Sequence, residues 1–159
     1  MVENQDFIIV HTITEKRTIQ GAVVDIKKTE KWSLKKYVGK DEVVTIPEGI
    51  ETISPNAFKN CETMHSVEIP ASVKTIGCGA FSNCINLKSV VILDSVKKIG
   101  SSAFANCENL EAVVFEGVVP WYNLEPQIFF NCPRLTIYAQ KDNPIKHYAN
   151  SKKIPFSPI

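Results

Sequence analysis

The sequence lacks a long hydrophobic run. No stretch of the 159 residues approaches the roughly 18 uninterrupted apolar residues that a membrane-spanning helix needs. The longest early apolar run, residues 7–10, is also too short for the core of a secretory signal peptide. We therefore expect no membrane insertion. The compartment stays open: the chain would be cytoplasmic if Met1 is the native start, and a cell-surface or secreted protein if an export signal preceded it.

The chain also lacks an excess of charge of either sign. Eighteen basic residues stand against seventeen acidic residues, which gives a formal net charge of +1. A protein that binds nucleic acid through its phosphates usually carries a clear surplus of Lys and Arg. The composition therefore argues against nucleic acid as a partner.

Motifs for catalysis, metal binding and cofactor binding are missing as well. The glycines occur singly or as Gly77-Cys78-Gly79, without the strand-to-helix context of a phosphate loop. The acidic residues show no paired-carboxylate pattern, and the five cysteines include no CxxC pair. We therefore expect no catalytic residue, no metal and no cofactor, and a protein that is not an enzyme.

What the sequence does contain is an internal repeat. Cys61, Cys84 and Cys107 are spaced 23 residues apart, and Cys132 follows after 25. An asparagine precedes each cysteine, a phenylalanine lies three residues before it, and a methionine or leucine lies three residues after it. These positions are Asn60, Asn83, Asn106 and Asn131; Phe58, Phe81, Phe104 and Phe129; and Met64, Leu87, Leu110 and Leu135. A period of this length is typical of solenoid proteins.

Each unit is predicted to contain a main strand, a turn, a short second strand and a short helical turn. The alternation Val67-Glu68-Ile69 has the period of two expected for a strand with one buried face. Phe81 and Cys84 have the spacing of a helical turn. In a stack of such units, equivalent side chains form continuous columns that bury what one unit cannot bury alone. Asparagine suits the end of the helical turn because it tolerates the left-handed backbone conformation.

At these positions the chain resembles the BspA-like leucine-rich repeats, whose pattern runs IPxxVxxIGxxAFxxCxxLxxVxI. Residues 69–92 fill that pattern without a gap. The resemblance implies an α/β leucine-rich-repeat solenoid with short strands and short helical turns, and a non-catalytic scaffold of a kind often found on bacterial surfaces. We expect an N-terminal β cap over residues 1–42, about four repeat units over residues 43–138, and a short helical C-terminal cap over residues 139–159.

The N-terminal cap is expected to cover the apolar columns that the end of a solenoid would leave exposed. Many β-forming residues in 7–14 and 18–26 predict two strands that pair there. Trp32, Leu34 and Tyr37 are candidates for the covering side chains. At the other end, two extra residues within 118–126 predict a bulge, and residues 144–150 have helical character.

The cysteines are the candidates for chemistry, and a structural role is favoured for them. Stacked positions form a row at the strand spacing of about 4.8 Å, and a row cannot enclose one tetrahedral zinc ion. Oxidation between adjacent thiols is within reach but disfavoured by their parallel orientation. Cys78 falls in a turn outside the column, where we expect it to be exposed. The repeat register places none of His11, His65 and His147 near it to make a nucleophile.

The outward positions of the main strands are predicted to form the binding face. Val90-Val91-Ile92 and Val113-Val114-Phe115 are unbroken apolar runs where alternation is expected. Isolated exposed valines are common on protein surfaces, but a contiguous apolar patch more often marks a contact. The candidate partner-binding residues are Val91, Ala112, Val114, Trp121 and Tyr122.

The partner of this face is predicted to be an unknown protein or a second copy of the chain. A curved face of stacked strands holds a partner by shape and by apolar contact. The alternative function is that of a fragment of a bacterial surface adhesin or antigen that binds host protein or glycan, for which the family resemblance is the support.

Overall fold

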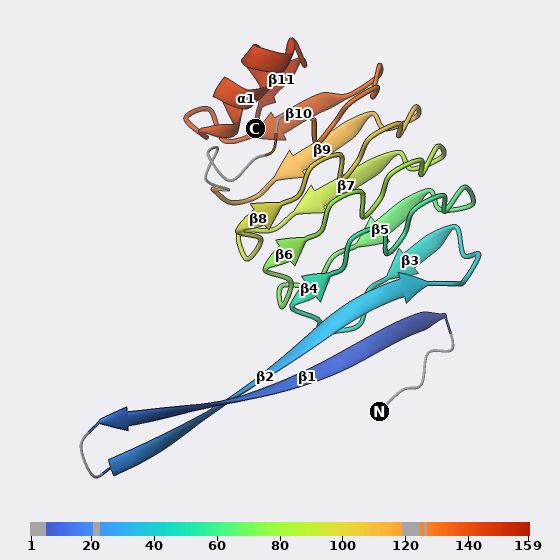
Figure 1. The fold of residues 1–159 in the computed structure, drawn as a ribbon. Coiled ribbons are helices and arrows are strands. Elements are labelled where there is room, and N and C mark those ends of the chain that lie inside the picture. The colour runs from blue at the N-terminus through green and yellow to red at the C-terminus, as the bar shows by residue number, and fades with distance from the viewer. Residues whose placement is uncertain (1–5, 21–22, 119–124, 126) are drawn as a thin grey trace.

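The computed structural model describes residues 6–20, 23–118, 125 and 127–159, and its repeat units stack into a solenoid (Figure 1). The main sheet has six parallel strands in the order β11-β10-β9-β7-β5-β3. They are β3 (Val43–Thr45), β5 (Ser66–Glu68), β7 (Ser89–Ile92), β9 (Ala112–Phe115), β10 (Thr136–Ala139) and β11 (Phe156–Pro158). The leucine-rich-repeat solenoid that the sequence predicts is confirmed, with about five turns.

A second sheet runs along the stack, in the order β1-β2-β4-β6-β8. Its repeat strands are two residues long: β4 (Thr52–Ile53), β6 (Thr75–Ile76) and β8 (Lys98–Ile99). At the N-terminal end, β1 (Phe7–Gln20) and β2 (Val23–Tyr37) form an antiparallel hairpin, and β2 pairs in parallel with β4. Figure 1 shows this hairpin extending well beyond the stack of units. The pairing expected between 7–14 and 18–26 is wrong: residues 18–20 belong to β1, and residues 7–14 pair with residues 29–37 of β2.

The core consists of columns of equivalent side chains, as the repeat predicts. The rings of Phe58, Phe81, Phe104 and Phe129 stack in that order, with centroid distances of 4.9, 5.0 and 5.5 Å. The leucine positions, the inward positions of the main strands and those of the second strands form further buried columns: Met64, Leu87, Leu110 and Leu135; Val44, Val67, Val90, Val113 and Ile137; Ile53, Ile76 and Ile99. Each side chain is therefore buried largely by the units on either side of its own.

The segments expected to be short helical turns are tight turns with bonds between units. Three of them hold two residues with left-handed φ, four positions apart: Asn56 and Asn60, Gly79 and Asn83, Ser102 and Asn106; the fourth has Asn131 in this conformation but not Gln127. Alternate N–H groups of the turn donate to the next unit, as Phe58 does to the carbonyl of Ala80 over 2.7 Å and Phe81 to that of Ala103 over 2.7 Å. An α-helix would direct the same N–H groups to carbonyls within its own segment.

The asparagines that precede the cysteines form a ladder of side-chain hydrogen bonds along the stack. Nδ2 of Asn83 donates to Oδ1 of Asn60 over 2.9 Å, Asn106 donates to Asn83 over 2.9 Å, and Asn131 donates to Asn106 over 3.1 Å. All four residues have φ between 54° and 65°, so the left-handed conformation expected of them is confirmed. Asparagine meets both requirements, because it tolerates this φ and its amide carries a donor and an acceptor.

Tyrosines close the phenylalanine stack at both ends. Tyr37 of β2 packs on Phe58 with a centroid distance of 5.3 Å. Tyr148, which belongs to helix α1 (Ile145–Lys152), packs edge-on against Phe129 at 6.2 Å. No helix in the described part of the chain is long and apolar enough to cross a bilayer.

The three side chains expected to cover the N-terminal end behave differently. Leu34 and Tyr37 are buried, whereas Trp32 is 40% exposed and stacks on His11 at 4.1 Å. The residue beside Trp32 in the first unit is Glu51, whose N–H donates to the Trp32 carbonyl. No apolar column therefore continues from Trp32 into the stack.

The stacked rings make Phe81 a stringent test of the fold. We expect Phe81→Ala to lower the free energy of unfolding by about 3–5 kcal/mol, because it opens a cavity between two other rings. Phe130→Ala is the matched control: this ring is 60% exposed, and its loss should cost less than about 1 kcal/mol. Urea unfolding followed by circular dichroism measures both. A Phe81→Ala variant no less stable than Phe130→Ala would contradict the stacked core.

Candidate functional site

The outer face of the main sheet presents two columns of side chains. Neighbouring strands are parallel, so equivalent residues of successive units lie side by side. One column reads Val43, Ser66, Ser89, Ala112 and Thr136, and the other reads Thr45, Glu68, Val91, Val114 and Tyr138. The alternate residues, such as Val90 and Val113, are buried. The outward side chains are therefore held on a backbone that the core fixes in place.

This face is mixed at its N-terminal end, where Val43 is 61% exposed among polar residues, and it becomes more apolar towards its C-terminal end. Oγ1 of Thr45 donates to Oε2 of the exposed Glu68 over 3.0 Å. Val91, at the equivalent position one unit further on, is 40% exposed. We define the apolar patch as Val91 with three partly exposed neighbours: Ala112, Val114 and Tyr138. Trp121 and Tyr122, which the sequence predicts beside these residues, lie outside the described residues.

Three of the four patch residues are among the binding residues predicted from the sequence, and Tyr138 is not. In earlier units the inward strand residue follows the leucine position by three residues, whereas Ile137 follows Leu135 by two. A slip of one residue moves the side chains of a strand to the opposite face. Tyr138 therefore faces outward beside Val114. The outward position of Tyr138 could have been predicted from residues 136–139, in which Thr and Tyr alternate with Ile and Ala.

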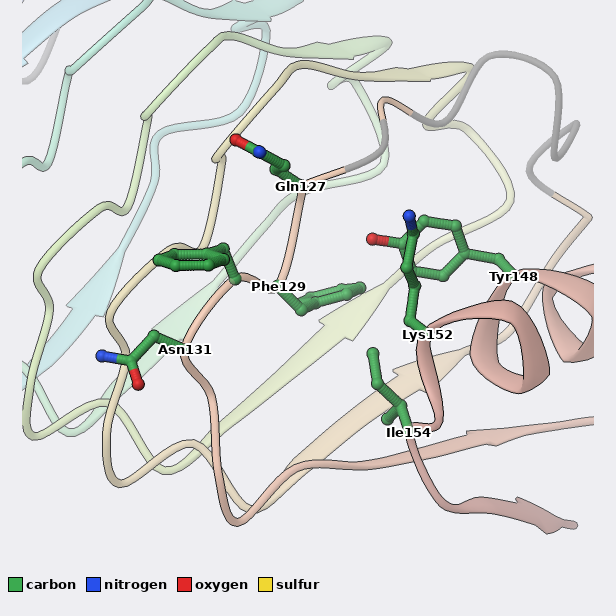
Figure 2. Close-up of a pocket in the computed structure, with 7 residues that line it drawn as sticks. Gln127, Phe129, Asn131, Tyr148, Lys152 and Ile154 are labelled. Atoms are coloured by element: carbon green, nitrogen blue, oxygen red, sulfur yellow. The ribbon is translucent and has the colours of Figure 1, made fainter.

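A pocket lies at the C-terminal end of the stack, beside the last turn and α1 (Figure 2). Its volume is about 280 Å³, and its lining combines aromatic rings with amide and amino groups. We define this terminal pocket by the residues Gln127, Phe129, Phe130, Asn131, Tyr148, Lys152 and Ile154. Figure 2 shows Tyr148 and Lys152 approaching from α1, with Gln127, Phe129 and Asn131 on the opposite segment.

Burial changes the ionisation of the two capping tyrosines. Desolvation raises the pKa of Tyr148 to about 12, although hydrogen bonds from the backbone at Phe129 and Ile128 oppose the shift. Desolvation is also the largest cause that raises the pKa of Tyr37 to about 12, and the Tyr37 hydroxyl donates to Oδ2 of Asp41 over 2.9 Å. Both ends of the stack are therefore closed by neutral hydroxyls.

The cysteine column is a row of thiols bonded to the backbone. Sγ of Cys84, Cys107 and Cys132 donates to the phenylalanine carbonyl of the preceding unit, over 3.1, 3.2 and 3.1 Å. Hydrogen bonds between neighbouring thiols and burial raise the pKa values of Cys84 and Cys107, which keeps both neutral. Cys78 is exposed, as expected. Among the described residues, no group of three or more His, Cys, Asp or Glu side chains is arranged to hold a metal ion.

Comparison with known families and proteins gives one family match. Residues 37–153 match the family described as BspA type Leucine rich repeat region, in six copies. A search of curated proteins finds no match. The matched segment covers well over half of the chain and includes the strands of the apolar patch.

Solved structures of bacterial proteins share the fold. A leucine-rich repeat protein from Eubacterium ventriosum is 24% identical with a TM-score of 0.58, over 72% of this chain and 32% of that one. A leucine rich cell surface protein from Faecalibacterium prausnitzii is 19% identical with a TM-score of 0.54, over 92% of this chain and 42% of that one. The pneumococcal vaccine antigen PcpA is 18% identical with a TM-score of 0.56, over 74% and 36%. The chain thus spans less than half the length of these structures.

The raised pKa of Tyr148 predicts a pH dependence of stability. Below about pH 10 a tyrosine is neutral in both the folded and the unfolded state, so its stabilisation is fully present. From pH 10 to about 12 the unfolded state releases a proton that the folded state keeps, so the free energy of unfolding falls. We expect a shallower fall in Tyr148→Phe, measured by urea unfolding at successive pH values. Equal slopes in variant and wild type would show that this hydroxyl is not buried.

Proposed function

The chain belongs to the BspA-type leucine-rich repeat family, and from this premise we propose that it is a non-catalytic scaffold that binds a protein partner through the outer face of the main sheet. The observation that carries the proposal is the apolar patch. Its residues stand on strands whose opposite side chains, such as Val90 and Val113, are buried in the core. A partner would therefore meet a preorganised surface, and preorganisation lowers the cost of binding.

The composition of the face supports a protein contact at the patch. Ser66, Glu68 and Ser89 occupy equivalent outward positions in earlier units, so these strands accept polar residues there. Val91 and Val114 nevertheless place two apolar side chains next to each other. An apolar centre with a polar rim and a neighbouring tyrosine is the usual anatomy of a protein interface.

The proposed partner is an unknown protein. The alternative is that a second copy of this chain binds through the same patch. A net charge of +1 does not favour nucleic acid. A contact between two copies around a twofold axis would use the same patch on both sides. A measurement of mass in solution separates self-association from binding to another protein.

The absence of catalysis is part of the proposal. Cys78 is the one nucleophile that the sequence singles out, and it lies exposed in a turn outside the cysteine column. The repeat register brings no histidine to it. If any activity is detected, it should survive Cys78→Ser.

The division of the chain into caps and repeats also belongs to the proposal: an N-terminal β cap over 1–42, units over 43–138 and a helical C-terminal cap over 139–159. Tyr37 on Phe58 and Tyr148 on Phe129 support the two caps. The family match runs from residue 37 to residue 153, so each cap shares positions with a repeat.

A second candidate function is that of a fragment of a bacterial surface adhesin or antigen that binds host protein or glycan. It is favoured by two structures of the same fold, described as a cell surface protein and a vaccine antigen, of which the chain spans 42% and 36%. The source gene decides the matter. An encoded export signal or further repeats upstream would support this function, and a stop codon just before Met1 would count against it.

The patch is tested by the double variant Val91→Lys with Val114→Lys. Lysines here would place two charges in an apolar contact, and we expect a loss of at least about tenfold in affinity for the partner or the second copy. The control is Val43→Lys with Thr45→Lys, which adds the same charge to exposed positions at the N-terminal end of the face, away from the patch. Melting temperature, mass in solution and partner retention are measured for both. If the patch variant keeps the mass and the partners of the wild type, the patch is ordinary surface.

A further inference from the structure

The terminal pocket lies where a further repeat unit would stack. In the interior, each asparagine of the ladder offers the next unit one donor and one acceptor. Its backbone N–H donates to the following turn, as Asn83 does to the carbonyl of Ala105 and Asn106 to that of Phe130, both over 2.8 Å. Its Oδ1 accepts from the amide of the following asparagine. The asparagine therefore contributes a pair of hydrogen bonds to each junction between turns.

Asn131 is the last asparagine of the ladder and has no following turn. Its Nδ2 donates back to Asn106 over 3.1 Å. Among the described residues, no group accepts from its backbone N–H or donates to its Oδ1. Asn131 is exposed, and it lines the terminal pocket. The pocket wall therefore carries the donor and acceptor that an interior unit uses to bind the next turn.

Two further side chains define what the pocket would accept. The Phe130 ring is 60% exposed, which favours an apolar group near the asparagine ladder, and the exposed Lys152 places a positive charge on the opposite wall. Tyr148 already covers Phe129, so the phenylalanine column is closed while the asparagine ladder is open. A volume of about 280 Å³ is near the lower limit for ligand pockets and suits one or two side chains of a turn better than a large ligand.

We propose that the terminal pocket binds an asparagine-containing turn of a second polypeptide, which extends the ladder by one step. The asparagine of the turn donates from Nδ2 to Oδ1 of Asn131, and a carbonyl of the turn accepts from the backbone N–H of Asn131. An acidic residue beside this asparagine pairs with Lys152. The pocket is separate from the apolar patch, so the proposal goes beyond the proposed function, and the failure of one leaves the other untouched.

The probe is a blocked hexapeptide with the sequence of residues 103–108, carrying serine in place of Cys107. It holds the Phe-x-Asn turn of an interior unit and ends in an acidic residue. Titration into the isotope-labelled full chain should give saturable shifts of the amide signals of residues 129–131 and Lys152. The same peptide with alanine in place of asparagine should bind about fivefold more weakly, because it loses the bond from Nδ2 to Oδ1 of Asn131, worth about 1 kcal/mol, and keeps the backbone carbonyl that accepts from the Asn131 N–H.

A matched pair of variants separates binding at the pocket from stability of the ladder. Asn131→Gly keeps the left-handed backbone and its N–H but removes the side-chain amide, and we expect it to lose about fivefold in peptide affinity because one of the two hydrogen bonds is lost. Asn60→Gly, at the other end of the ladder, also removes one ladder bond, and it should bind the peptide like the wild type. If Asn131→Gly does not fold, Gln127→Ala with Phe130→Ala replaces it, since both side chains are exposed.

Three results would overturn the proposal. The first is the absence of saturable shifts up to the solubility limit of the peptide. The second is equal binding of the asparagine and alanine peptides. The third comes from N-acetylglucosamine, whose acetamido group offers the same donor and acceptor: if it shifts the signals of residues 129–131 and the peptide does not, the pocket recognises a sugar and not a turn.

Discussion

Hydrogen bonding along the stack axis is the constraint on which the rest of the structure depends. Main strands, second strands and turns all direct backbone groups to neighbouring units, so a unit is completed only by another unit. Because parallel strands are about 4.8 Å apart, each axial position must accept a copy of itself at that distance. Phenylalanine rings can stack on one another at this distance, and asparagine amides can form hydrogen bonds with one another across it. The same closeness explains Gly77 and Gly100, where a Cβ would lie 2.5 Å from a backbone nitrogen of the adjacent unit.

The columns of the core could be predicted because equivalent apolar residues recur every 23 residues in the sequence. Phe81 and Cys84 are buried, as this repeat requires. The conformation of the turns could not be predicted, since a three-residue spacing fits both a helical turn and a tight turn bonded to its neighbour. Tyr138 escaped prediction because one residue fewer precedes β10. The terminal pocket also escaped it, because its walls come from the last turn and α1, which only the folded C-terminal segment brings together.

Each end of the stack would leave a terminal phenylalanine exposed, and a different element covers it at each end. The N-terminal end uses a tyrosine from a strand, and the C-terminal end uses a tyrosine from a helix. In both cases an aromatic ring covers the terminal phenylalanine. The helix is itself anchored by Asn143, whose Oδ1 accepts from the N–H of Ile145 and whose Nδ2 donates to the carbonyl of Gly117, each over 3.0 Å. The two tyrosines therefore cover the ends of the phenylalanine column, while polar ladder groups at the C-terminal end stay accessible.

The equivalence of successive junctions makes the solenoid modular in length. Sheet, turn and ladder bonds are repeated between units at the same relative positions, so a whole unit of 23 residues could be deleted or duplicated without creating a junction of a new kind. Such a change would alter the outer face one row at a time. Deleting the unit that contains Val91 would set Glu68 beside Val114, and duplicating it would lengthen the valine column. Insertion and deletion of units would thus change the composition of this surface while the tyrosine contacts at the two ends of the stack stay the same.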